Sequence, residues 1–290
     1  MENRKQLLNV YQPGSIHWVG DGFHVRNLFP SNDLGDRISP FLLLDYAGPT
    51  HFPPSNQPHG VGEHPHRGFE TVTIVYQGGV RHRDSAGNQG TIGPGDVQWM
   101  TAASGVVHEE MHEQEFARRG GILEMVQLWV NLPGAHKMSA PRYQTLFDAD
   151  IPHVDLPDDA GYARIIAGEY DGVRGPARTF SPMNVWDLRL NAGSSTLLNL
   201  PEGYNTALFV LDGGMEVNNT RSVAEAALAV FDRPGTLIGI EVEKNATVLV
   251  LNGAPIEEPM ASHGPFVMNT EAELVQAYND YRSGKMGHLY

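Results

Sequence analysis

The stretch ETVTIVYQGGVRH, residues 70–82, consists of an apolar strand pattern, a pair of glycines and a second strand pattern. Apolar and β-branched residues at period two are typical of β-strands, and paired glycines between them are typical of a turn. The same arrangement returns in NTALFVLDGGMEV, residues 205–217. A Pro-Gly turn signal follows each copy, at residues 94–95 and 234–235. This internal repeat predicts two tandem β domains.

Outward from the repeat, the chain keeps the same rhythm of short strands and turns. Further strand patterns occur at residues 16–19, 96–100, 123–130, 184–190 and 246–251. The 290-residue chain contains 32 Gly and 20 Pro, which suits short strands joined by tight turns. We therefore predict an all-β fold with an N-terminal domain over residues 1–140 and a C-terminal domain over residues 141–290. The boundary is expected within the polar stretch 132–157.

The end of the chain has a helical pattern instead. Thr270 and Glu273 have the spacing of a capping box, and Leu274 and Tyr278 follow at helical spacing. This predicts a short C-terminal helix over residues 271–283, which ends the second domain. Its apolar stripe is expected to pack on a sheet.

Composition excludes several functional classes. The formal net charge of −14 and the absence of a basic stripe argue against direct binding to nucleic acid. The chain has no cysteine, so disulfides, thiolate nucleophiles and iron–sulfur clusters are excluded. No apolar run reaches the roughly 18 residues of a membrane span, and the N-terminus lacks the apolar core of a signal peptide. We expect a cytoplasmic protein that does not bind membranes.

Two short stretches each contain two histidines, EHPHRGFE at residues 63–70 and SGVVHEEMHE at residues 104–113. On a strand, residues i and i+2 share a face, so His64 and His66 can direct two imidazoles to one point. His108 and Glu110 have the same spacing. Three imidazoles and one carboxylate suit Fe(II), Mn, Ni, Co, Cu or Zn, and they leave a coordination position open for substrate.

Glu70 is an alternative to Glu110 as the carboxylate, because its parity also matches His64 and His66. His59, His82 and His112 are interpreted as surface or supporting residues. The offset of the repeat places Asn199, Pro201 and Asn205 at the positions of His64, His66 and Glu70, so the second domain has no matching ligands. One metal per chain, in the first domain, is the prediction.

The motifs HPHRGFETV, PGDVQWMTA, GVVHEEM and QLWVNLP resemble those of the pirin family, within the cupin superfamily. The ending GPFVMNTEAELVQAYNDYRSGKMG is also similar to the pirin C-terminus. The resemblance implies two tandem cupin β-barrels of the jelly-roll type, followed by a short C-terminal helix. It also implies that His64, His66, His108 and Glu110 are the metal ligands and that Glu70 has a supporting role. The glycine spacing of the general cupin motif is not kept before His64.

The same resemblance implies a metal-dependent quercetin 2,3-dioxygenase activity, with Fe(II) as the preferred ion. A flavonol would chelate the metal through its hydroxyl and ketone, Glu110 would accept the hydroxyl proton, and O2 would open the ring with release of carbon monoxide. The candidates for the substrate pocket are Phe69, Trp99, Met100, Met125 and Trp129. The alternative is a redox-sensing iron protein that acts on a protein partner. We expect a monomer, since tandem barrels can cover each other.

Overall fold

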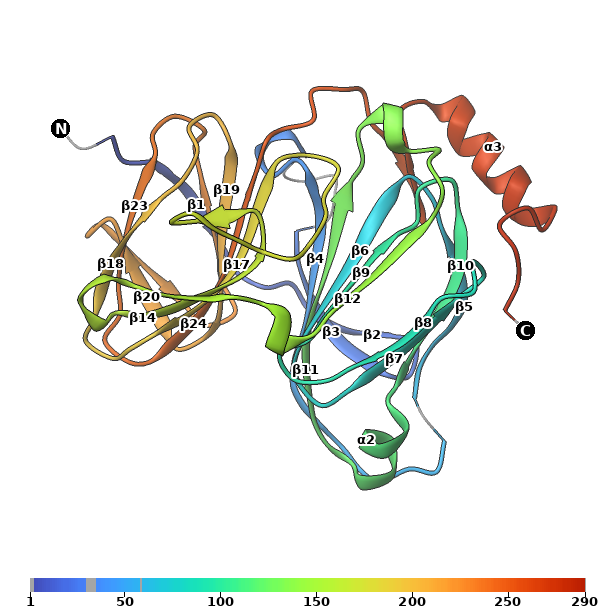
Figure 1. Cartoon of the computed structure of the whole chain (residues 1–290), viewed down its shortest axis with the longest axis horizontal. Helices are drawn as coiled ribbons and strands as arrows, with labels where there is room; N and C mark the ends of the chain where they lie inside the picture. Colours follow the sequence, from blue (N-terminus) through green and yellow to red (C-terminus); the bar gives the residue numbers. More distant parts are fainter. Residues whose placement is uncertain (1–2, 30–34, 58, 290) are drawn as a thin grey trace. The chain divides into compact units, whose positions relative to one another are not determined.

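The computed structural model describes residues 3–29, 35–57 and 59–289, and most of their regular structure is β-strand (Figure 1). Two compact units are formed, and each contains one seven-stranded, one four-stranded and one two-stranded antiparallel sheet. The predicted all-β fold with a short C-terminal helix is therefore confirmed. Among the described residues, no helix is long and apolar enough to cross a lipid bilayer.

One unit, which we call the histidine unit, comprises Ser15–Phe29, Leu42–Asp148 and Ile256–Tyr290. Its larger sheet has the order β12 (Arg142–Leu146), β9 (Val97–Thr101), β6 (Phe69–Gln77), β11 (Gly121–Asn131), β4 (Phe41–Phe52), β3 (Phe23–Phe29) and β2 (Ile16–Val19). Its four-stranded sheet has the order β5 (Gly60–His66), β10 (Val106–His112), β7 (Val80–Asp84) and β8 (Gln89–Ile92). The remaining elements are α2 (Gln114–Arg119), β25 (Ala261–His263), β26 (Phe266–Met268) and α3 (Glu271–Arg282).

The other unit, here the second unit, comprises Met1–Gly14, Pro30–Phe41 and Ala149–Pro255. Its larger sheet has the order β1 (Leu7–Tyr11), β22 (Leu228–Phe231), β19 (Asn205–Asp212), β24 (Ala246–Gly253), β17 (Met183–Leu190), β14 (Gly161–Ala167) and β13 (His153–Asp155). Its smaller sheets contain β18 (Ser195–Asn199), β23 (Leu237–Glu241), β20 (Gly214–Val217) and β21 (Arg221–Ala224), and β15 (Glu169–Tyr170) with β16 (Val173–Arg174).

The sequence repeat corresponds to equivalent places in the two units. Strand β6 lies between β9 and β11, and β19 lies between β22 and β24. In each copy, a glycine after the strand adopts positive φ, +85° at Gly78 and +80° at Gly213. A residue with a Cβ atom would be sterically strained in this conformation. The following strands β7 and β20 belong to the four-stranded sheets. The glycine pairs therefore turn the chain from one sheet into the other.

The interiors of the two units differ in polarity at matching positions. Leu208 and Val210 of β19 are buried in a large apolar cluster with Val248 and Val250 of β24. The position in β6 that corresponds to Leu208 is Thr73, whose hydroxyl donates a hydrogen bond to Glu110. At this position the second unit has a buried apolar side chain, whereas the histidine unit has a polar one that contacts Glu110.

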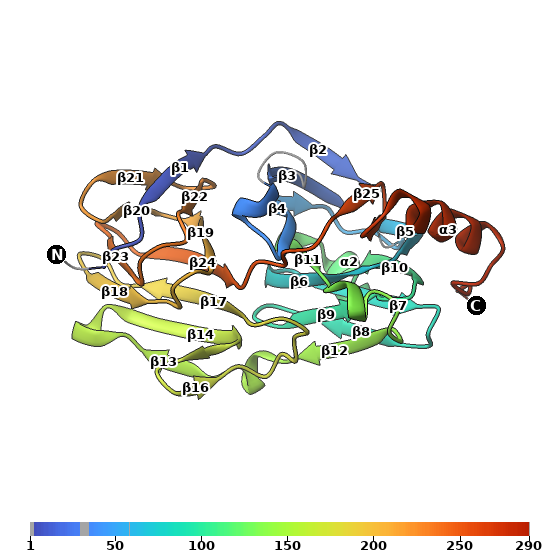
Figure 2. The same cartoon turned by 90° about the horizontal axis from the view of Figure 1, so that it is seen from above.

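The C-terminal helix has the predicted capping box. Thr270 Oγ1 accepts a hydrogen bond from the Glu273 N–H, and the Glu273 carboxylate accepts one from the Thr270 N–H. Leu274 and Ala277 of α3 are buried in one cluster with Val107 of β10. Both views show α3 at the side of the histidine unit where β5 and β10 lie (Figures 1 and 2).

This packing differs from the predicted division at residue 140, which assigned the chain end to the second domain. The compact units instead group Ile256–Tyr290 with the histidine unit. Two interactions explain the grouping. The apolar face of α3 covers Val107, and the Asp280 carboxylate of α3 pairs with the buried Arg67 guanidinium at 2.9 Å. A division by order along the chain misses such contacts, because they join segments that are far apart in sequence.

Candidate metal centre

Two paired strands carry the histidines. Strands β5 and β10 are antiparallel, with His108 opposite His64, and the pairing has an irregularity between His108 and Glu110. On its other edge β10 pairs with β7, where Glu110 lies opposite His82. The spacing of two residues within each motif therefore places side chains from neighbouring strands on a common face.

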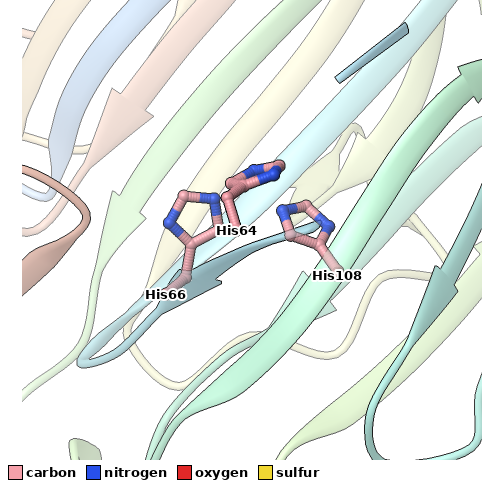
Figure 3. A group of neighbouring side chains, drawn as sticks. All are labelled: His64, His66 and His108. Carbon is pink, nitrogen blue, oxygen red and sulfur yellow. The ribbon is translucent and has the colours of Figure 1, made fainter. Parts of the chain in front are cut away.

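Three imidazoles converge at this place (Figure 3). The ring centroid of His64 lies 4.8 Å from that of His66 and 4.2 Å from that of His108, and the His66 and His108 centroids are 4.8 Å apart. One nitrogen from each ring lies within 4.8 Å of the others. His66 and His108 are buried, whereas His64 is partly exposed. His64 is thus the member of the cluster that contacts solvent.

Each of these rings offers a nitrogen that the protein leaves bare. His64 Nδ1 lies 2.8 Å from the Gly62 carbonyl, so Nδ1 carries the hydrogen and Nε2 is free. His66 Nδ1 and His108 Nε2 are buried without a hydrogen-bond partner. Burial lowers the pKa of His66 and of His108 well below 6.5, and the nearby His64 lowers both further. Neutral imidazoles with buried bare nitrogens are suited to a metal ion, because an unpaired buried acceptor costs about 1–3 kcal/mol.

The carboxylate of Glu110 is also buried and is held by two neighbours. Thr73 Oγ1 of β6 donates to Glu110 Oε1 at 3.3 Å, and Gln127 Nε2 of β11 donates to both oxygens at 3.2 and 3.1 Å. One ligand atom from each of Glu110, His82 and His108 lies within 4.8 Å of the others. This group shares His108 with the three-histidine group. All four predicted ligands therefore lie in two overlapping groups, and their role as ligands stays a prediction.

The sequence matches two profiles of one protein family. The profile described as Pirin matches residues 22–130, and the profile described as Pirin C-terminal cupin domain matches residues 185–287. A Pseudomonas aeruginosa protein named "Putative quercetin 2,3-dioxygenase PA2418" is 56% identical over 281 residues, which cover 97% of this chain and 98% of that protein. The chain belongs to the pirin family.

Two further similarities agree with this membership. A pirin-like protein of Solanum lycopersicum is 40% identical over 271 residues, covering 92% of this chain and 88% of the relative. The crystal structure of a quercetin 2,3-dioxygenase from Acinetobacter baumannii superposes with a TM-score of 0.96 at 51% identity, covering 99% of each chain. The predicted pirin resemblance and the tandem cupin fold are thereby confirmed.

In this pirin, two of the aromatic residues proposed for the pocket contact the cluster. The ring of His66 lies 5.0 Å from that of Phe69 and 5.3 Å from that of Trp129, and the latter two are 4.3 Å apart. Trp99 pairs with Val72 and is fully buried, and Met125 packs in an apolar core. Phe69 and Trp129 are therefore the candidates for an aromatic wall beside the site.

Glu70 does not face this centre. It pairs with Thr101 across the sheet, and Thr101 Oγ1 donates to Glu70 Oε1 at 2.7 Å. Because Glu70 and Thr73 are three residues apart on β6, they point to opposite faces, and Thr73 reaches Glu110. Glu70 would share a face with His64 and His66 only if one continuous strand joined them. The chain instead turns at Gly68, with φ +88°, between β5 and β6.

The remaining histidines of the region have separate environments. His59 Nδ1 lies 2.9 Å from Asp21 Oδ2, and His112 Nε2 donates to the Gly22 carbonyl at 2.8 Å. His82, by contrast, is fully buried and its Nδ1 lies 3.2 Å from His108 Nδ1. Sequence reasoning grouped it with the surface or supporting residues. The signal that could have distinguished it is its place on β7 two residues from Asp84, in a strand whose alternate residues are buried.

Glu70→Gln is expected to change the pH dependence of stability and to leave metal binding unchanged. Burial raises the pKa of Glu70 to about 7, although the Thr101 hydrogen bond opposes the rise. Between pH 4.5 and 7 the folded state therefore keeps a proton that the unfolded state has released. The free energy of unfolding of the wild type should fall by about 3 kcal/mol as the pH rises across this range. The variant cannot ionise there and should lack this fall. Urea denaturation of metal-free protein across this range measures it, and parallel profiles would contradict it.

Proposed function

We propose that this chain is a metal-dependent dioxygenase that opens the ring of a flavonol such as quercetin with O2 and releases carbon monoxide. The observation that carries the proposal is the pair of buried bare nitrogens, His66 Nδ1 and His108 Nε2, beside the partly exposed His64. The quercetin 2,3-dioxygenase names of its relatives supply the substrate class.

The proposed ligands are His64, His66, His108 and Glu110. Three neutral nitrogens and one carboxylate suit Fe(II), which we propose as the physiological ion, and also Zn, Mn, Ni, Co or Cu. The ion would supply Lewis acidity at the hydroxyl and ketone of the flavonol and would favour loss of the hydroxyl proton.

The side chains have distinct roles in this proposal. Glu110 accepts the proton of the flavonol hydroxyl. Thr73 and Gln127 hold the Glu110 carboxylate by hydrogen bonds of 3.1–3.3 Å, so its direction is fixed before substrate arrives. Phe69 and Trp129 offer aromatic faces beside His66 for contact with a planar flavonol ring.

Oxygen uptake tests the proposal. Protein purified without oxygen and loaded with Fe(II) should consume O2 when quercetin is added and should release carbon monoxide. The same preparation of His64→Ala should do neither, because one of the four ligands is missing. No uptake by wild-type protein with full metal occupancy would overturn the enzymatic function. A redox-sensing role toward a protein partner would then be the better proposal.

Glu110→Gln should lower the rate with quercetin by about 100-fold to 10,000-fold, because glutamine cannot accept the hydroxyl proton. Glu109→Gln is the matched control on the same strand, since the Glu109 carboxylate pairs with Arg83 at 2.6 Å. The control should keep the wild-type rate. The measurement is the initial rate divided by the metal content of each preparation. Equal rates for the two variants would contradict the role of Glu110.

A further inference from the structure

A chain of hydrogen bonds leads from His108 to a buried carboxylate on β7. His108 Nδ1 lies 3.2 Å from His82 Nδ1, and His82 Nε2 lies 3.4 Å from Asp84 Oδ2. All three side chains are buried. The turn after β7 fixes the carboxylate, because Asp84 Oδ1 accepts hydrogen bonds from the backbone N–H groups of Ala86 and Asn88. Asp84 thus presents Oδ2 to His82 from a rigid turn.

The side chains around His82 determine which atom donates in each of these hydrogen bonds. Tyr143 donates to Gln98 Oε1 at 3.2 Å, which directs the Gln98 amide N–H toward His82 Nδ1, also at 3.2 Å. His82 Nδ1 is therefore an acceptor whose single lone pair is shared by the Gln98 amide and the His108 ring, and the hydrogen between the two rings belongs to His108 Nδ1. The Asp84 carboxylate only accepts, which independently places the hydrogen of His82 on Nε2.

We infer that His82 and Asp84 are positioning residues that hold His108 in the tautomer with hydrogen on Nδ1 and a bare Nε2. That bare nitrogen is the one that is buried without a partner, in the ring that faces His64 and His66. A carboxylate behind a histidine ligand fixes the ring and increases its basicity. Here the carboxylate acts through a second histidine. The inference rests on the proposed metal site.

A second role for His82, as a metal ligand with His108 and Glu110, is disfavoured by the donors that surround it. His82 Nδ1 faces the Gln98 amide and the His108 ring, and His82 Nε2 faces the Asp84 carboxylate. Neither nitrogen of His82 is therefore left bare for a cation, whereas His108 keeps its bare Nε2. The ring of His82 also stacks on Tyr143, with centroids 5.0 Å apart and planes at 22°, which fixes its orientation.

Two variants test the hydrogen bonds that link His108 to His82 and Asp84. Asp84→Asn keeps an oxygen for the turn N–H groups but presents an amide donor to His82 Nε2. His82 should then carry its hydrogen on Nδ1, and His108 should shift to the tautomer with hydrogen on Nε2. His82→Phe keeps the ring that stacks on Tyr143 and removes both nitrogens. His112→Phe is the matched control, because His112 is a buried histidine of β10 whose ring bonds only to the Gly22 carbonyl among the hydrogen bonds described.

The first measurement is nitrogen NMR of histidine-labelled, metal-free protein, in which the two nitrogens of a neutral imidazole give distinct shifts. Wild-type His108 should carry hydrogen on Nδ1, and Asp84→Asn should move it toward Nε2. The second is binding of Co²⁺, followed by its visible absorption. Asp84→Asn and His82→Phe should each weaken binding about 10-fold to 100-fold, while His112→Phe should not.

Three results would overturn the inference. They are a wild-type His108 with hydrogen on Nε2, unchanged Co²⁺ affinity in both variants, or a second bound Co²⁺ in wild type that His82→Phe removes. The tautomer measurement needs neither metal nor substrate. Failure of the quercetin assay therefore leaves this inference standing, and a wrong tautomer does not affect the test of the proposed function.

Discussion

His108→Ala should lose nearly all bound metal and all metal-dependent oxygen uptake. His108 is the residue that the two candidate ligand groups share, so its removal leaves neither group with three members. Loss of a supporting residue behind a ligand typically costs 10-fold to 100-fold in metal affinity, and loss of the ligand itself should cost more than about 100-fold. Metal analysis after dialysis against a fixed free concentration of Co²⁺ measures the effect.

The variant should remain folded, because the apolar clusters of the histidine unit do not include His108. Circular dichroism and the urea midpoint of the metal-free protein provide this control. His59→Ala is the matched variant, since His59 pairs with Asp21 outside the cluster. Full metal content in folded His108→Ala protein would refute the ligand assignment.

Arg67→Met should destabilise the protein by about 1–3 kcal/mol, because it removes the buried partner of the Asp280 carboxylate and leaves only the contacts with Lys285 and Gln276. The Arg67 guanidinium donates to Asp280 Oδ2 at 2.9 Å and to the Ser104 carbonyl at 2.7 Å, and both side chains of the ion pair are at most 10% exposed. Chemical denaturation followed by tryptophan fluorescence measures the free energy of unfolding.

An exposed ion pair supplies the control for this prediction. Arg118 contacts Glu115 at 2.7 Å, but both side chains are more than half exposed, so Arg118→Met should cost less than about 1 kcal/mol. A pH series adds a second check. Hydrogen bonds from Lys285 and Arg67 lower the pKa of Asp280 to about 2, below its ordinary 3.8. The advantage of wild type over Asp280→Asn should therefore persist above pH 4 and shrink as the pH falls toward 2. Equal losses in Arg67→Met and Arg118→Met would contradict the prediction.

The features that could be predicted from sequence depend on local periodicity. Strands β6 and β19 were found because alternation and paired glycines are properties of adjacent residues. The spacing of His64 to His66 likewise placed both rings on one face, and the convergence with His108 follows from the pairing of β5 with β10. The capping box of α3 was also local and was found correctly.

The features that could not be predicted depend on breaks in strands and on contacts between distant segments. The period-two pattern predicts the wrong face for Glu70 because the chain turns at Gly68. Such a pattern does not indicate where one strand ends and the next begins. His82 could not be recognised as a neighbour of His108, since the pairing of β7 with β10 joins residues 26 apart. The place of α3 depends on Arg67 and Asp280, which are 213 residues apart.

The grouping of Ile256–Tyr290 with the histidine unit has a consequence for biosynthesis. A ribosome makes β5 and β10 before the long segment Ala149–Pro255 of the second unit. The helix that covers Val107 and the carboxylate that pairs with Arg67 are made only after that segment. A nascent chain that stops before Asp280 would carry every proposed ligand and still lack the ion pair that anchors the residue next to His66. Maturation of the metal centre is therefore expected to wait until α3 has been synthesised.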